Sequence, residues 1–160
     1  MTMGQVAGRR MTAEIDGDFV VFLIGARFNS KLEFARCFAD LGGRRGMKHM
    51  LDYLVAHPEK GLLAYEMGLP TIVQYWRSFE QLEAFAKDRD DPHLDVWRQY
   101  WRRVGRSSRT GIWHETFLVK AGQYEAVYGN MPPHGLGKAG RLVAVSESSS
   151  ARARITASSV

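Results

Sequence analysis

Cysteine is almost absent from this sequence of 160 residues, which contains a single one, Cys37. One thiol cannot form an internal disulfide, and Cys37 has no Cys or His partner at the spacing of a metal site. A disulfide-stapled secreted fold and a zinc ribbon are therefore excluded. We expect Cys37 to be an ordinary core residue.

Long apolar runs are also lacking. The longest, Phe19 to Ala26, contains a glycine and ends before Arg27, far short of the roughly 20 residues that a membrane-spanning helix needs. Arg9 and Arg10 near the N-terminus are not followed directly by the apolar stretch of a secretory signal. The sequence therefore predicts a soluble, cytoplasmic protein with no membrane partner.

Charge of one sign is not concentrated in the central part of the chain, although the formal net charge is +5. Much of the excess lies near the two ends, while the middle mixes both signs. One local basic run follows what we expect to be the outer side of a helix, and we interpret it as a solvated face rather than a phosphate-binding one. Its members are Arg98, Arg102, Arg103, Arg106 and Arg109. No nucleic-acid partner is predicted.

Apolar residues make up 45% of the chain, enough for one hydrophobic core at this length. We expect a disordered segment over residues 1–12, a single domain over 13–143, and a disordered tail over 144–160, where Ser, Ala and Arg dominate.

Hydrophobic periodicity and turn residues predict the secondary structure of the domain. Ser78 to Gln81 has the form of a capping box, and Asp91 followed by Pro92 is typical of a helix start. The expected elements, in chain order, are a strand Phe19–Asn29, one broken or two short helices from Lys31 past Leu54, a hairpin of strands Leu62–Leu69 and Thr71–Trp76, helices beginning at Phe79 and Pro92, a strand Ile112–Val119, and a short strand Tyr124–Tyr128.

The order of these elements indicates an α+β fold of the ferredoxin-like βαββαβ type, with the helices on one face of the sheet. The other face has no cover within one chain. We expect this face, with Trp76 on it, to pair with a second copy and form a homodimer.

Several blocks of the sequence resemble one known family. They are Phe19 to Asn29, Tyr75-Trp-Arg-Ser-Phe-Glu80, Pro92-His-Leu94 with Trp97-Arg98, and Gly111-Ile-Trp-His-Glu-Thr-Phe-Leu-Val119 with Asn130-Met-Pro132. The sequence is similar over about residues 10–143 to proteins like the fumagillin-pathway monooxygenase, within the antibiotic-biosynthesis monooxygenase superfamily. That resemblance implies a dimeric α+β barrel, and relatives that include cofactor-free oxygenases and haem-degrading enzymes.

The haem-degrading branch offers a separate comparison. It places an asparagine on the first strand, a tryptophan at the end of the third, and a histidine iron ligand on the helical region that follows. Asn29, Trp76 and His93 occupy similar places here. Trp76 and His93 lie 17 residues apart, however, a longer spacing than that branch suggests.

Cofactor-free oxygenation needs a base, a closed apolar pocket and a donor that holds a developing anion. We expect the polar end of the first strand to mark the pocket, with Arg27 and Asn29 binding a substrate oxygen. Trp76 is the candidate for stacking on a ring, and His114 or His93 is the candidate base.

Each of these residues also has a structural interpretation. Arg27 can pair with Glu66 or Glu115 across the sheet, and Trp76 can belong to a dimer interface. His93 can donate to a carbonyl near the start of its helix.

Adjacent residues of a strand point to opposite faces, so only one of His114 and Glu115 can face the pocket. Glu115 is therefore kept as a candidate substrate-binding residue beside His114. The five histidines show no metal-ligand spacing, and no dinucleotide or nucleophile motif is present.

Three hypotheses follow. The first is a small monooxygenase that oxidises a hydrophobic metabolite with dioxygen, without flavin or metal. The second is a haem-binding or haem-degrading relative in which His93 or His114 ligates iron. The third is a non-catalytic dimeric ligand-binding domain.

Overall fold

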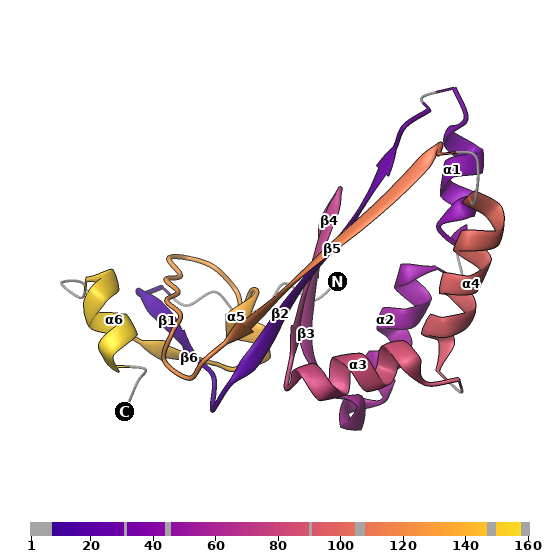
Figure 1. Cartoon of the computed structure of the whole chain (residues 1–160). Coiled ribbons are helices and arrows are strands. Elements are labelled where there is room, and N and C mark those ends of the chain that lie inside the picture. Colours follow the sequence, from indigo (N-terminus) through magenta and orange to yellow (C-terminus); the bar gives the residue numbers. More distant parts are fainter. Residues whose placement is uncertain are drawn as a thin grey trace.

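The computed structural model describes residues 8–30, 32–43, 46–89, 91–104, 108–146 and 150–157. Its centre is a four-stranded antiparallel sheet in the order β3-β4-β2-β5 (Figure 1). The strands are β2 (Phe19–Phe28), β3 (Leu62–Met67), β4 (Thr71–Trp76) and β5 (Thr110–Val119). The first and third of these strands in chain order lie in the middle, which is the ferredoxin-like arrangement. The predicted α+β fold is confirmed.

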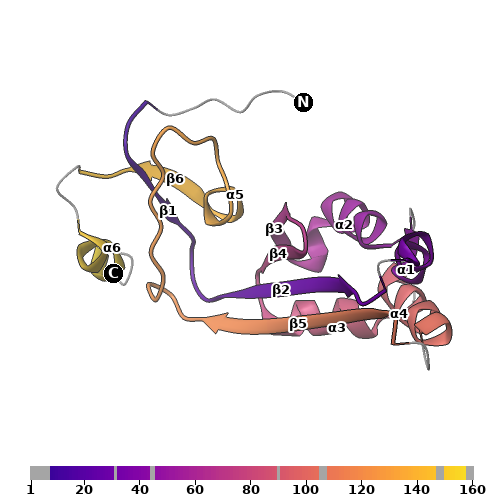
Figure 2. The ribbon, with the colours of Figure 1, turned by 90° about the horizontal axis from the view of Figure 1, so that it is seen from above.

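Four helices lie together on one side of this sheet (Figures 1 and 2). They are α1 (Phe34–Asp40), α2 (Met47–Ala56), α3 (Phe79–Lys87) and α4 (Pro92–Val104). A short 3-10 turn, Pro58–Lys60, connects α2 to β3. The glycines after α1 divide the first helical stretch into two helices, as their positions predicted.

The start of α3 shows how local chemistry sets a boundary. Ser78 is extended, and its side chain accepts a hydrogen bond from the backbone N–H of Gln81 at 3.2 Å. The predicted return bond from the Ser78 N–H to the Gln81 side chain is not formed, and Nε2 of Gln81 donates to the carbonyl oxygen of Glu59 at 3.1 Å. This contact joins α3 to the turn that precedes β3.

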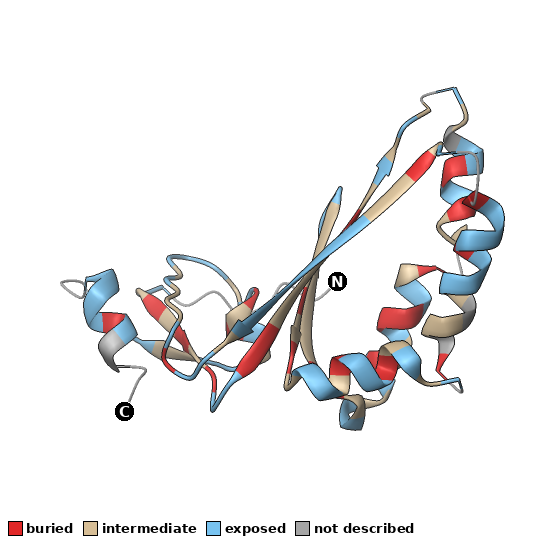
Figure 3. Ribbon diagram, in the orientation of Figure 1, coloured by how far each residue is buried: buried red, intermediate tan, exposed pale blue. Residues whose placement is uncertain are grey.

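The core lies where α2 and α3 meet the lower half of the sheet, as the buried residues in Figure 3 show. Its members are Val20, Met50, Leu51, Leu54, Leu62, Trp76, Leu82 and Phe85. Trp76 is fully buried there, on the face that the helices cover. The expectation that Trp76 lies on the uncovered face is therefore wrong. In β2 and β4, Val20 is paired with Trp76, so the side chain of Trp76 follows that of Val20 into the core.

A second, smaller unit lies on the other side of the main sheet (Figure 1). Strands β1 (Met11–Glu14) and β6 (Arg141–Ala144) pair antiparallel, and the short helix α5 (Leu136–Ala139) contacts β3. Helix α6 (Ala151–Ala157) follows. The predicted short strand Tyr124–Tyr128 is reduced to a single bridge between Tyr128 and Met11.

Two boundary predictions are thereby corrected. The segment expected to be disordered at the N-terminus includes half of β1, while residues 1–7 lie outside the described part. The expected disordered tail contains α6, which begins with Ser150 accepting from the N–H of Ala153. Arg154 of α6 is buried and forms an ion pair with Glu125. This ion pair binds α6, a helix with little apolar surface, to the segment that follows β5.

Candidate functional site

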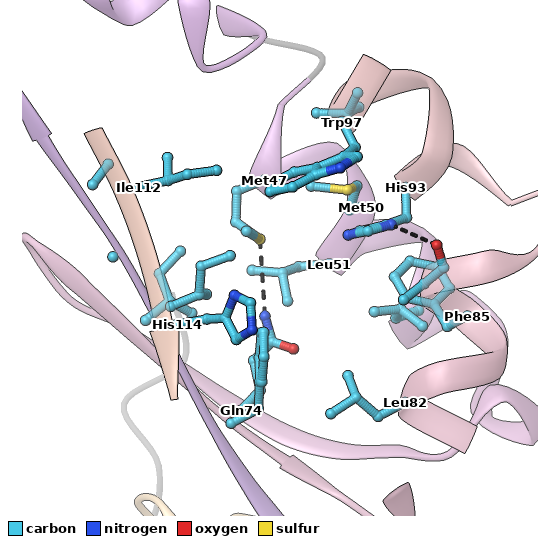
Figure 4. A pocket seen from close by; sticks show the side chains of 18 of the residues that line it. Met47, Met50, Leu51, Gln74, Leu82, Phe85, His93, Trp97, Ile112 and His114 are labelled. Carbon is cyan, nitrogen blue, oxygen red and sulfur yellow. Dashed lines mark hydrogen bonds between the residues drawn. The ribbon is translucent and has the colours of Figure 1, made fainter. Parts of the chain in front are cut away.

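A cavity of about 430 Å³ separates the upper part of the sheet from the helices (Figure 4). Its size is within the range of small-molecule sites. The floor comes from alternate residues of the strands, and the opposite wall comes from α2, α3 and α4. Its principal apolar residues are Phe22, Ile24, Met47, Met50, Leu51, Leu54, Ile72, Leu82, Phe85, Val96, Trp97 and Ile112.

The cavity is almost free of formal charge. Among the described residues, its lining includes no Lys or Arg, and Glu83 is its one carboxylate. Glu83 is half-exposed and pairs with Lys87 at 2.7 Å, one turn along α3. No cluster of three or more His, Cys, Asp or Glu that could hold a metal ion occurs in the part of the chain that the structure describes. The site therefore suits an uncharged, apolar ligand.

His93 lies in the first turn of α4 and forms part of the helical wall. Its Nδ1–H donates to the carbonyl oxygen of Ala86 in α3 at 3.1 Å. A carbonyl can only accept, so Nδ1 bears the proton and Nε2 of the neutral ring has a lone pair. Among the described residues Nε2 has no hydrogen-bond partner, and Figure 4 shows the ring directed toward the cavity.

Burial lowers the pKa of His93 from its ordinary value of 6.5, and the hydrogen bond to Ala86 only partly opposes this shift. The ring stacks on Trp97 with centroids 6.4 Å apart, and it is tilted against Phe85 with centroids 5.7 Å apart. His93 is therefore neutral at pH 7 and able to accept a proton at Nε2.

His114 lies on β5 and faces the same cavity from the sheet (Figure 4). Its ring contacts Phe22 of β2, with centroids 5.4 Å apart. Because β5 is an edge strand, His114 is exposed at the cavity opening. Two histidines from opposite walls thus face one space.

Trp76 and Gln74 of β4 form the deepest polar contact of the cavity. The indole Nε1 of Trp76 donates to Oε1 of Gln74 at 2.9 Å. The ring of Trp76 packs on Phe85 at 5.8 Å between centroids. Trp76 is thus a wall of the cavity whose indole N–H is already satisfied.

Three of the predicted site residues lie elsewhere. Arg27 and Glu115 are exposed and belong to the opposite sheet face, because Phe22, Ile24 and Ala26 are the residues of β2 that face the cavity. Asn29 follows β2, and its side chain donates to the carbonyl of Ser108 at 2.8 Å. The expectation that the polar end of this strand marks the pocket is therefore wrong.

Sequence reasoning missed Gln74, Trp97 and Tyr100. Gln74 shares a strand face with Ile72 and Trp76, and this single polar residue on an apolar face was the available signal. Trp97 and Tyr100 lie on α4, whose start the sequence predicted without indicating which of its residues line a cavity. Their rings stack with centroids 5.9 Å apart beside the cavity.

Comparison with known proteins agrees with this fold. The sequence model of the family described as Monooxygenase af470-like matches residues 19–136. The chain belongs to this family. The match includes the whole main sheet, the four helices and therefore every element that lines the cavity.

One curated member of this family gives a direct comparison. Monooxygenase af470 of Aspergillus fumigatus is 32% identical to this chain over 132 residues, which are 76% of this chain and 46% of that protein. The chain spans about half the length of the curated relative that it matches.

A solved structure of an aldoxime dehydratase, OxdRE, in complex with butyraldoxime is similar in fold. The TM-score is 0.64 with 16% sequence identity, and the match covers 88% of this chain and 43% of that chain. At this identity the likeness establishes the architecture alone. Among the described residues, no helix has the length and apolar character of a membrane span.

Proposed function

We propose that this family member is a monooxygenase that oxidises an uncharged, hydrophobic metabolite with dioxygen, without flavin or metal. The observation that supports it most is the pairing of an apolar, nearly charge-free cavity with a partly buried, neutral histidine. Nε2 of His93 is the one basic atom on the helical wall of that cavity among the described residues.

The chemistry that such a site can perform begins with proton transfer. Nε2 of His93 accepts a proton from an activated carbon or hydroxyl of the substrate, and the anion left behind is electron-rich enough to react with dioxygen. Buried residues of the cavity wall such as Met50 and Leu51 keep water away from that anion. His93 then returns the proton as water departs.

Without a cofactor, all the electrons must come from the substrate. The balanced reaction is R₂CH₂ + O₂ → R₂C=O + H₂O, in which one oxygen atom enters the product and the other leaves as water. We therefore propose a substrate with a methylene group acidified by neighbouring unsaturation.

Oxygen uptake by purified, chelator-treated protein tests this proposal. Anthrone is a suitable probe, because its methylene lies between two aromatic rings. We expect the protein to accelerate uptake, and His93→Gln to lower the rate at least 100-fold, within the range for a general base. His49→Gln makes the same change at an exposed position of α2 and should leave the rate unchanged.

Two outcomes would revise the proposal. A greater loss from His114→Gln than from His93→Gln would make His114 the base. If anthrone and other electron-rich ketones and phenols bind but none consumes oxygen, the protein is a non-catalytic ligand-binding domain.

Haem binding is a second candidate function, supported by one feature of His93. A metal-bound histidine usually donates its other ring N–H to a carbonyl or carboxylate, as Nδ1 of His93 does to Ala86. His93 would then hold the iron through Nε2, and the iron would supply oxygen activation. We rank it second because no Lys or Arg of the described lining could pair with haem propionates.

Hemin titration separates the two candidates. A saturable, sharpened Soret band that is lost in His93→Gln would make haem binding the better account. A spectrum that only sums free hemin and protein would contradict it.

The partner proposed for this chain is a second copy. On the outer face of the sheet, Trp113 and Phe117 of β5 are 38% and 48% exposed. The ring of Trp113 lies so close over Gly25 of β2 that an added Cβ would be 2.5 Å from its Nε1. Helix α5 covers the β3 side, where Lys138 pairs with Glu66 at 2.9 Å, so the β2 and β5 side is the surface for pairing.

A further inference from the structure

Gln74 is a buried polar residue in the floor of an apolar cavity. It is 4% exposed and lies in the middle of β4, where its backbone pairs with Phe22 of β2 and Tyr65 of β3. A primary amide with so little exposure must satisfy its hydrogen-bonding groups inside the protein. How it does so determines what the cavity offers a ligand.

The orientation of the amide follows from its neighbour. The indole N–H of Trp76 can only donate, so the Gln74 atom that it meets at 2.9 Å is the carbonyl oxygen Oε1. The amino group Nε2 is therefore turned the other way, toward Sδ of Met47 on α2, at 3.9 Å. Figure 4 shows this contact extending from the sheet toward the helical wall.

That contact is a weak one. A thioether sulfur is a poor acceptor, and an amide NH₂ has two hydrogens to donate. Within the described residues Gln74 makes only these two hydrogen bonds, one through Oε1 and one to sulfur. The floor of the cavity therefore presents a preoriented donor with spare capacity, surrounded by apolar side chains.

We propose that Nε2 of Gln74 binds a carbonyl oxygen of the substrate, which makes the substrate class an uncharged, apolar ketone. This proposal rests on the proposed function, because it assigns an orientation to the substrate of the same cavity. The lining has no Lys or Arg among the described residues to neutralise a carboxylate, so a neutral acceptor fits better than an anion.

The donor and the base come from opposite walls of the cavity. When Nε2 of His93 removes a proton from a carbon that is conjugated with the carbonyl, the negative charge of the enolate moves to the carbonyl oxygen. Nε2 of Gln74 then donates to that oxygen in a site that excludes water, where removing such a donor typically costs 10²–10³-fold in rate. Gln74 would thus bind the substrate and stabilise its anion.

Ligand binding tests the proposed hydrogen bond from Gln74 to the substrate carbonyl independently of turnover. The probes are 1-tetralone and tetralin, which differ by one carbonyl group, and the readout is the ratio of their dissociation constants by calorimetry. Because both probes have the same apolar ring system, a change in its packing alters both dissociation constants alike and leaves their ratio unchanged. Gln74→Met removes the donor at similar size, and Gln74→Glu keeps an acceptor for Trp76 but replaces the donor by a carboxylate.

We expect both variants to lower the preference for the ketone by about 5- to 10-fold, the value of one hydrogen bond. Tetralin affinity should change less than twofold in Gln74→Met. Gln99→Met makes the same substitution at an exposed position of α4 and should leave the ratio unchanged. Circular dichroism and a denaturation midpoint verify that each variant is folded.

The failures are distinguishable. If both probes bind and the ratio of their dissociation constants is unchanged in folded Gln74→Met and Gln74→Glu, the hydrogen bond from Gln74 to the ligand carbonyl is refuted. The cavity would then still be a ligand-binding site. If neither probe binds the wild-type protein, the proposed hydrogen bond from Gln74 and the proposed function are both refuted.

Discussion

Asp40 at the end of α1 is predicted to hold the upper part of the helical wall to the sheet. Its carboxylate is 3% exposed and accepts from Nε and Nη2 of Arg109 at 2.7 and 2.9 Å, and from Thr110 at 3.1 Å. The carbonyl of Thr110 in turn accepts from the hydroxyl of Tyr100 at 3.0 Å, beside the cavity. The carboxylate therefore joins α1 to β5, and the backbone of Thr110 in turn joins β5 to α4.

The change Asp40→Asn keeps the size of this side chain and removes its charge. An asparagine can still accept through one oxygen, but it turns an NH₂ group toward the guanidinium or the threonine. Breaking a buried pair costs about 3–5 kcal/mol, and since the Arg109 side chain remains 23% exposed we expect about 3 kcal/mol. Urea unfolding at pH 7 measures this loss.

The pH dependence gives a second readout with a defined sign. The hydrogen bonds from Arg109 hold the pKa of Asp40 below its ordinary value of 3.8, although burial opposes them. A lowered folded-state pKa contributes stability above the unfolded value that is lost as the pH falls through the folded value. The difference in the free energy of unfolding between wild type and Asp40→Asn should therefore be constant from pH 7 to about 5 and shrink below pH 3.8.

An exposed ion pair provides the matched control. Asp52→Asn makes the same change in the ion pair between Lys48 and Asp52, which are four residues apart on α2. We expect this variant to lose about 0.3–0.5 kcal/mol of unfolding free energy. If Asp40→Asn costs no more than Asp52→Asn, the reasoning about this connection is refuted.

Three further predictions test other parts of the structure. Because burial lowers the pKa of His93, the unfolded chain binds more protons below pH 6.5; the free energy of unfolding should fall between pH 7.5 and 5.5, and less so in His93→Gln, as urea titrations at both pH values would show. Arg154→Ala removes the ion pair with Glu125, so amide exchange in α6 should accelerate at least tenfold, whereas unchanged exchange would contradict the role of that pair. Phe117→Lys should raise the dimer dissociation constant at least tenfold in light scattering, and a monomeric wild type would refute the dimer.

The sequence predicted the order of the main elements because those signals are local. Strand Phe19–Phe28 is apolar at nearly every position, and Ser78 has the chemistry of a helix cap. Hairpin β3–β4 follows from Gly68 and Pro70 between two strand-like runs. Each of these features depends on neighbours within a few residues, so one sequence suffices to recognise it.

The site was only partly predictable, because which sheet face the helices cover is set by tertiary packing. His93 and His114 were found by their chemistry. Arg27 was assigned to the cavity from its polarity, whereas the cavity face of β2 is its wholly apolar one. Gln74 was missed since its importance depends on Trp76, which fixes its amide through a side-chain contact.

Pairs distant in the sequence also escaped prediction. Asp91 was expected only as the residue before the start of α4, and nothing in the sequence indicated that its carboxylate accepts from Tyr53 at 2.6 Å and pairs with Lys60 at 2.9 Å. Arg109 was assigned to a solvated basic face, yet it binds Asp40, 69 residues away. Long-range ion pairs have no periodic signature in the sequence.

The central claim is that this cavity oxygenates an apolar substrate with His93 as the base, and isotope labelling tests it most directly. Chelator-treated protein is supplied with anthrone under ¹⁸O₂, and the product is analysed by mass spectrometry. The account predicts one ¹⁸O atom in each new carbonyl, one O₂ consumed per product, and loss of this reaction in His93→Gln but not in His49→Gln. Product formed at the same rate by His93→Gln, or a new oxygen derived from water, would contradict it.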